Sequence, residues 1–128
     1  MLDTSVLAKW FRPEPEVNTD AALRLLDEFE AGDLHVVVPP LVYLELLNIG
    51  VRRWATDAKQ LLAFASRLLG LPFTVRQPDL LAVARWTARG LTAYDACYVA
   101  LAEERGTTVV TDDRQMLTVG PGIAVPLA

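Results

Sequence analysis

Five acidic residues stand at places where an α/β chain could bring them together. Asp3 follows two apolar residues, Glu45 lies in an apolar helix, and Asp95 lies in the first turn of a later helix. Asp112 and Asp113 directly follow a β-branched segment. Carboxylates gathered at one place repel one another and lose solvation. A divalent cation offsets both effects, and Mg²⁺ or Mn²⁺ prefers hard oxygen ligands. These residues therefore indicate a metal site that could acidify a bound water and stabilise charge on a phosphoryl oxygen.

Other catalytic devices are missing from the sequence. Its single histidine, His35, lies in an expected strand, so no Ser–His or Cys–His pair is apparent. Its single cysteine, Cys97, excludes an intrachain disulfide and a cysteine-based zinc site. Neither GxGxxG nor GxxxxGK[ST] occurs, which excludes nucleotide binding by those loops. The carboxylates remain as the candidates for chemistry.

Four of the acidic residues also have a structural interpretation. Asp3 could cap the helix that follows it, with about even odds on position alone. Asp95 stands three residues after Thr92, close to a capping box, so a cap is favoured when that residue is taken singly. Asp112 and Asp113 could form a turn before a short helix. The joint pattern is better support for a site than any one member.

Glu45 has apolar neighbours on both sides in an expected helix. A buried, unpaired carboxylate would be costly. Either the helix exposes this stripe, or Glu45 has a cation as a partner. Asn48, one turn further on, and then Arg52 are expected on the same face.

The elements that would position these residues alternate along the chain. Apolar periodicity and capping signals predict a helix up to residue 11 and further helices at 21–31, 41–54, 56–69, 79–89, 93–105 and 114–118. Strands are expected at 1–2, 34–38, 73–76, 107–111 and 123–125. This order predicts an α/β fold with right-handed crossovers and a mostly parallel sheet covered by helices. Ligand sites in such folds lie at the carboxyl ends of the strands.

Composition limits the class of protein. The chain has 128 residues, 52% of them apolar and 22% charged, so we expect one folded domain over residues 1–128 rather than disorder. The proline-broken stretch 12–16 lies too near the N-terminus to divide domains. No long apolar stretch or basic leader is present, which predicts a soluble, cytoplasmic protein without a membrane anchor. The net charge of −4 argues against a surface that coats polyanions, but not against one local nucleic-acid patch.

Four segments together resemble a known family. They are residues 2–11, 40–48, 109–114 and, the most specific, 91–102 with the sequence LTAYDACYVALA. In this order and spacing they resemble the PIN-domain ribonucleases, in particular the VapC-like toxins of prokaryotic toxin–antitoxin pairs. The resemblance implies a three-layer α/β/α sandwich around a mostly parallel sheet of about five strands. The chain departs from the family in its first strand, since only two residues precede Asp3.

The resemblance also implies roles for the acidic residues. Asp3 and Asp95 would be the principal ligands of Mg²⁺ or Mn²⁺, and Glu45 would bind metal or orient water. The family pattern of Thr, any residue, Asp makes Asp113 the fourth acid, although Asp112 could substitute. Supporting groups near the metal or phosphate would be Thr4, Ser5, Asn48 and Thr111. Residues that would contact RNA phosphates are Lys9, Arg12, Arg52, Arg53 and Arg114, although each one taken singly is better interpreted as solvated surface.

The function implied is metal-dependent hydrolysis of RNA phosphodiester bonds by an endoribonuclease toxin. Its partners would be an RNA substrate, a cognate antitoxin with a segment over the acidic rim, and a second copy in a homodimer. Apolar residues of the helix at 56–69 are candidates for such contacts, although about half of them should face the core; they are Leu61, Leu62, Phe64 and Leu68. One alternative is a PIN-fold binding module that no longer cleaves. A weaker one is an acidic α/β domain of phosphoacceptor or phosphatase type.

Overall fold

The computed structural model describes residues 1–12 and 18–128. The proline-broken stretch therefore lies, apart from Arg12, outside the described residues. The helices are α1 (Thr4–Phe11), α2 (Thr19–Glu30), α3 (Leu41–Arg52), α4 (Ala58–Leu69), α5 (Leu80–Ala88), α6 (Ala93–Glu104) and α7 (Arg114–Val119). The strands are β1 (Val37–Val38), β2 (Thr74–Val75), β3 (Val109–Thr111) and β4 (Ala124–Pro126). Each expected helix occurs within a few residues of its predicted bounds. Strands β1, β2 and β3 are shorter than predicted, whereas β4 has the predicted length and is shifted by one residue.

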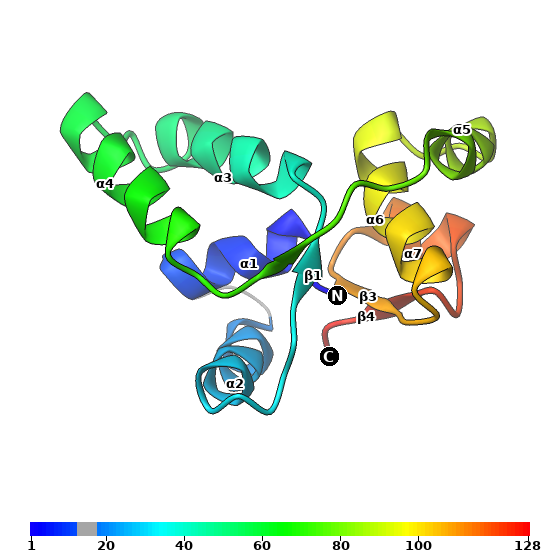
Figure 1. The fold of residues 1–128 in the computed structure, drawn as a ribbon, viewed down its shortest axis with the longest axis horizontal. Helices are drawn as coiled ribbons and strands as arrows, with labels where there is room; N and C mark the ends of the chain where they lie inside the picture. The colour runs from blue at the N-terminus through cyan, green and yellow to red at the C-terminus, as the bar shows by residue number, and fades with distance from the viewer. Residues whose placement is uncertain (13–17) are drawn as a thin grey trace.

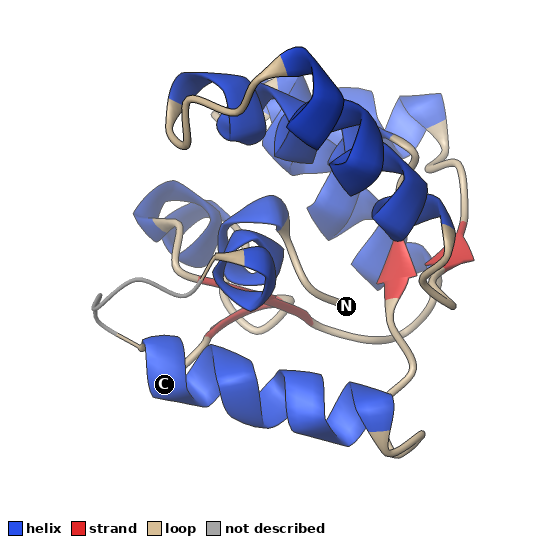
Figure 2. Cartoon of the chain, turned by 90° about the vertical axis from the view of Figure 1, so that its left-hand side faces the viewer, coloured by secondary structure: helices blue, strands red, loops and turns tan. Residues whose placement is uncertain are grey.

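All strand pairs are parallel, which confirms the predicted α/β class. β1 pairs with β2, and β3 pairs with β4. A parallel bridge between Leu2 and Val110 adds the N-terminal segment beside β3, in place of a full first strand. Within the described residues no ladder joins the two pairs of strands. Figure 1 shows the strands at the centre of the molecule, with α3 and α4 on one side and α5 to α7 on the other. Helices also lie above and below the strands in Figure 2.

The core forms where helices from both ends of the chain pack on these strands. Six of the twelve residues of helix α6 are buried, because small and apolar side chains follow one another along its middle. Trp10 of α1 packs against Phe29 of α2 with ring centroids 5.3 Å apart, and its Nε1 donates to the carbonyl of Ala22. Burial of such an aromatic ring with its N–H satisfied stabilises the junction of the two helices. The last turn of α1 is thereby held against α2.

Helix α4 packs on α3 through one face only. Leu68 is fully buried, Leu61 and Phe64 are partly buried, and Leu62 is 72% exposed. The expectation that some of these residues face the core is therefore met by Leu68. Whether Leu62 contacts a second copy or another protein stays a prediction.

No helix among the described residues has the length and apolarity needed to span a bilayer.

Candidate active site

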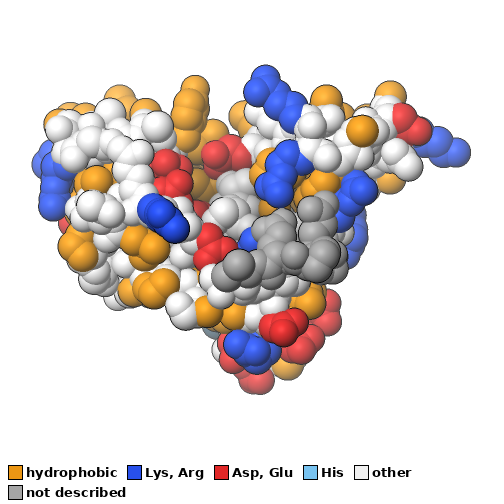
Figure 3. All heavy atoms as spheres, turned by 180° about the vertical axis from the view of Figure 1, so that it is seen from behind, with side chains coloured by type: hydrophobic (Ala, Val, Ile, Leu, Met, Phe, Trp, Pro, Cys, Tyr) orange, Lys and Arg blue, Asp and Glu red, His pale blue; other side chains and the backbone are white. Residues whose placement is uncertain are grey.

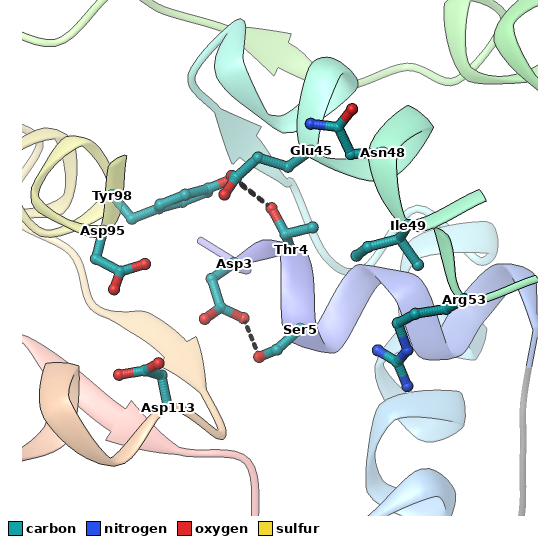
Figure 4. Close-up of a pocket in the computed structure, with 10 residues that line it drawn as sticks. All are labelled: Asp3, Thr4, Ser5, Glu45, Asn48, Ile49, Arg53, Asp95, Tyr98 and Asp113. Atoms are coloured by element: carbon teal, nitrogen blue, oxygen red, sulfur yellow. Dashed lines mark hydrogen bonds between the residues drawn. The ribbon is translucent and has the colours of Figure 1, made fainter. Parts of the chain in front are cut away.

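A hollow on one face of the molecule gathers acidic side chains between lysine and arginine side chains (Figure 3). Its cavity volume is about 330 Å³. Its lining comes from the start of α1, one face of α3, the first turns of α6 and the turn before α7 (Figure 4). The lining residues are Asp3, Thr4, Ser5, Glu45, Asn48, Ile49, Arg53, Asp95, Tyr98 and Asp113. Four carboxylates that are distant in sequence therefore share one pocket.

Asp3 reaches this pocket because of the parallel bridge beside β3. Its backbone N–H donates to the carbonyl of Val110, which places the carboxylate at the carboxyl end of the strands. Its Oδ1 accepts from the backbone N–H of Val6 at 3.2 Å and so caps α1, and also accepts from Ser5 Oγ at 2.6 Å. Its Oδ2 accepts from the hydroxyl of Thr111. The capping interpretation and the pocket position therefore hold together for this residue.

Asp95 and Asp113 likewise combine a helix start with a place in the pocket. Thr92 caps α6 by accepting from the backbone N–H of Asp95 at 3.1 Å, which leaves the Asp95 carboxylate directed toward the acids around it (Figure 4). Asp113 caps α7 by accepting from the N–H of Met116 at 2.9 Å. Its own N–H donates to Thr111 Oγ1 at 2.9 Å. Thr111 thus connects Asp113 to Asp3, although it is buried and outside the pocket lining.

Burial and mutual repulsion raise the pKa values of two of these acids. Asp3 is only 5% exposed, and loss of solvation raises its pKa to about 6. Its hydrogen bonds oppose that shift, and the charge of Asp95 adds to it. The pKa of Asp95 is raised by burial first, and then by the charges of Asp113 and Glu45. Such a concentration of negative charge is unfavourable without a compensating cation.

Glu45 has a partner that the sequence did not indicate. Its Oε1 accepts hydrogen bonds from the hydroxyl of Tyr98 at 2.6 Å and from that of Thr4 at 2.8 Å. Glu45 is partly buried and lines the pocket, so two hydroxyl groups satisfy one of its oxygens while a cation partner stays a prediction. Burial and then the Glu45 charge raise the pKa of Tyr98, so its hydroxyl stays protonated and can donate. The feature of the sequence that could have identified Tyr98 is its position one turn after Asp95 on the same helix.

The side chain of Asp112 contacts residues outside the pocket lining. Lys9 Nζ lies 3.6 Å from Asp112 Oδ2, and Asn18 Nδ2 donates to Oδ1 at 3.2 Å. Asp112 does not line the pocket, whereas Asp113 does. The geometry thus favours Asp113 as the fourth acid of the pocket. Lys9 is buried against Asp112, which is a different placement from the exposed phosphate contact expected of it.

The other basic residues that were expected to contact RNA lie in different places relative to the pocket lining. The face of α3 that lines the pocket carries Glu45, Asn48 and Ile49, and Arg53 just beyond the helix continues it. Spacings of three, four and eight residues explain this set, since they return to one side of a helix. Arg52 was expected on this face but does not line the pocket. Arg12 Nη1 donates to the backbone carbonyl of Trp54, and Arg114 is exposed at the start of α7. Contact of any of these residues with RNA stays a prediction.

The donor set suits a hard cation that keeps part of its water shell. Within residues 1–12 and 18–128 no three carboxylate, imidazole or thiolate groups are arranged to hold one ion by themselves. Mg²⁺ is commonly bound through one or two carboxylates together with water and substrate phosphate, so the pocket fits that mode. A site with only oxygen donors does not suit the nitrogen and sulfur preference of structural zinc.

Comparison with known proteins identifies the same architecture. The family model described as PIN domain matches residues 1–120. The chain is similar to PAE2754 from Pyrobaculum aerophilum, with 27% identity and a TM-score of 0.69 over 98% of this chain and 87% of that one. It is similar in fold to FitAcB from Neisseria gonorrhoeae, with 21% identity and a TM-score of 0.71 over 98% of this chain and 96% of that one. A search of curated proteins found no match.

Proposed function

Because the chain belongs to the PIN domain family, whose members are generally nucleases, we propose that it is a Mg²⁺- or Mn²⁺-dependent endoribonuclease. The observation that carries the proposal is the meeting of Asp3, Glu45, Asp95 and Asp113 in one pocket. The raised pKa values of Asp3 and Asp95 support it, because perturbed carboxylates in a cleft are typical of functional sites.

Each side chain has a distinct role in this proposal. Asp3 and Asp95 would be the principal ligands of the cation, with Asp113 as the fourth acid beside them, and Glu45 would bind the cation or orient a water molecule. A divalent cation bound there would supply a Lewis acid for the scissile phosphate and make water more acidic. Glu45 Oε2 accepts no hydrogen bond from the described residues, so it can accept a proton from that water. Arg53 brings positive charge to a lining that holds four carboxylates, and this charge would attract an RNA phosphate.

We further propose that the protein acts as a VapC-like toxin in the cytoplasm. A cognate antitoxin would then cover the pocket, with an arginine among the carboxylates in place of the cation, and two copies would form a dimer. The four segments that resemble the toxins support this part of the proposal, as does the likeness of fold to FitAcB. Binding assays with a candidate antitoxin would test it separately from cleavage.

The test of the proposed function is cleavage of a labelled structured RNA with Mg²⁺, with Mn²⁺ and with EDTA. Asp95→Asn should abolish cleavage, because it removes a charge from the cation site and leaves the Thr92 cap in place. Asp20→Asn is the matched control, since Asp20 is an exposed acid in the first turn of α2, away from the pocket. Cleavage that survives EDTA or the Asp95 change would refute the mechanism.

An inert wild-type protein would have two possible causes, and calorimetry separates them. Titration with Mn²⁺ should reveal a site that Asp95→Asn weakens and that Asp20→Asn leaves unchanged. Metal binding without cleavage would indicate a narrow RNA target that the assay lacks. A folded protein that binds no metal would be a non-cleaving binding module instead.

A further inference from the structure

Three oxygen atoms from three helices meet at the inner wall of the pocket. The hydroxyl of Tyr98 in α6 lies 2.6 Å from Glu45 Oε1 in α3, and the hydroxyl of Thr4 in α1 lies 2.8 Å from the same atom. The two hydroxyl oxygens are themselves 2.6 Å apart. These contacts join segments that are 41, 53 and 94 residues apart in the sequence. The cluster therefore connects helices from both sides of the molecule at the proposed active site.

The count of hydrogen atoms in this cluster determines what each group can do. An ionised Glu45 brings no proton, so two hydroxyl protons serve three short contacts. Either hydroxyl could be the donor in the contact between Thr4 and Tyr98, but the phenol is the more acidic of the two and favours the carboxylate. Tyr98 then donates to Glu45 Oε1, and Thr4 donates either to the same atom or to Tyr98. In both arrangements Glu45 Oε1 accepts from Tyr98, so the side of this oxygen that faces Tyr98 is not available to a ligand in the pocket. Oε2 accepts from none of the described residues and is left for a ligand in the pocket.

The environment of Tyr98 makes it a rigid donor. Tyr98 is 1% exposed, and it lies on the side of α6 that also buries Val99 and Ala102 in the core. Its helix also carries Asp95, so the hydroxyl is held in a fixed position relative to that carboxylate. A glutamate side chain has several rotatable bonds, and ordering it on cation binding would oppose that binding. An anchor on Oε1 removes this freedom before the cation arrives.

We propose that Tyr98 is a positioning residue that holds Glu45 through its hydroxyl, so that the free carboxylate oxygen is presented to a divalent cation or its water. The inference rests on the proposed function of the pocket. It assigns different roles to the two parts of the tyrosine: the ring fills the core, and the hydroxyl contacts Glu45 and Thr4. Hydrogen bonds to the outer side of metal-binding carboxylates commonly change metal affinity or activity by about 10- to 100-fold.

The test compares Tyr98→Phe with wild type by Mn²⁺ calorimetry, thermal unfolding without metal, and steady-state RNA cleavage. We expect Mn²⁺ affinity about tenfold weaker and kcat reduced, with an unchanged KM for RNA, because Tyr98 orients an acid rather than binding the substrate. Tyr94→Phe is the matched control, since this tyrosine lies one turn earlier in α6 and is 64% exposed. It should behave as wild type.

A double-mutant cycle distinguishes positioning from a general loss of packing. If Tyr98 acts through Glu45, Tyr98→Phe should cause no further loss of Mn²⁺ affinity in a Glu45→Gln background. An additive loss, or a folded Tyr98→Phe protein with wild-type affinity and kcat, would overturn the inference. If the wild-type protein binds no Mn²⁺, the proposed function fails and the inference fails with it. This outcome is distinct from failure of the inference alone, in which the wild-type protein still binds Mn²⁺.

A measurement on the wild-type protein covers the case in which Tyr98→Phe does not fold. The chain has three tyrosines, so ¹³Cζ-labelled tyrosine yields three resonances that Tyr43→Phe and Tyr94→Phe assign by elimination. Addition of Mg²⁺ should shift the Tyr98 resonance, because the cation withdraws charge from the carboxylate that accepts its hydrogen bond. A Tyr98 signal that does not move while Mg²⁺ binds would overturn the inference.

Discussion

Replacing Asp3 with asparagine should make the metal-free protein more stable at neutral pH while it weakens cation binding. The reason is that Asp3 is buried and its pKa is raised to about 6 from 3.8. A carboxylate with a raised pKa contributes stability below its unfolded pKa, and that stability is lost as pH rises through the folded pKa. Metal-free wild type should therefore lose stability between about pH 4 and pH 6.5 and be least stable above that range.

The size of the effect follows from the shift. Each pKa unit corresponds to about 1.4 kcal/mol, so full ionisation of Asp3 lowers the free energy of unfolding by about 3 kcal/mol. About 2 kcal/mol of this falls between pH 4.5 and pH 7.5. Asparagine keeps the Oδ1 acceptor that caps α1, but it places an amide against the Thr111 hydroxyl, and that lost hydrogen bond costs about 1 kcal/mol. The net gain expected for Asp3→Asn at pH 7.5 is about 2 kcal/mol.

The assay is urea unfolding of both proteins in EDTA at pH 4.5 and pH 7.5. Other titrating groups, including Asp95 with its raised pKa, are present in both proteins, so the difference between them reports Asp3 together with its charge coupling to Asp95. Addition of Mg²⁺ at pH 7.5 should stabilise wild type by mass action and Asp3→Asn much less. The reasoning would be refuted by a variant less stable than wild type at pH 7.5, or by a stability difference that does not change with pH.

Three further outcomes are expected. Asp113→Asn should abolish metal-dependent cleavage while Asp112→Asn retains it, as RNA assays would measure, because only Asp113 lines the pocket. Leu46→Ala should lower the free energy of unfolding by about 2–5 kcal/mol in urea titrations, since that side chain is fully buried and its removal leaves a cavity. Thr92→Ala should lower it by about 1 kcal/mol through loss of the α6 cap, and substitution with serine, which keeps the hydroxyl, should restore it.

The order and type of the elements follow from local signals that a sequence displays directly. Apolar residues at helical spacing and β-branched runs identify the helices and the strands. Caps at Asp3, Thr92 and Asp113 bond to groups only three residues away, so the starts of α1, α6 and α7 were predictable from neighbouring residues. Strands β1 to β3 were predicted longer than they are, because apolar runs extend beyond the few residues that form ladders, whereas β4 has its predicted length.

Other features depend on how elements pack against one another. The choice between Asp112 and Asp113 depends on the side of the turn that Lys9 and Asn18 occupy, and these lie about a hundred residues away in the sequence. The place of Arg53 rather than Arg52 beside the pocket depends on the rotation of α3 about its axis. One residue along a helix changes direction by about 100°, so a small difference in packing decides which arginine lines the pocket.

The sequence by itself determined which residues could do the chemistry, since type, spacing and helix caps already place four carboxylates near the ends of parallel strands. Only the tertiary structure decided how those carboxylates are held. The partner of Glu45 is Tyr98, and that pairing depends on two helices meeting side by side. Hydrogen bonds act over about 3 Å, so their partners are set by packing between distant segments, and periodicity within one segment carries no information about them.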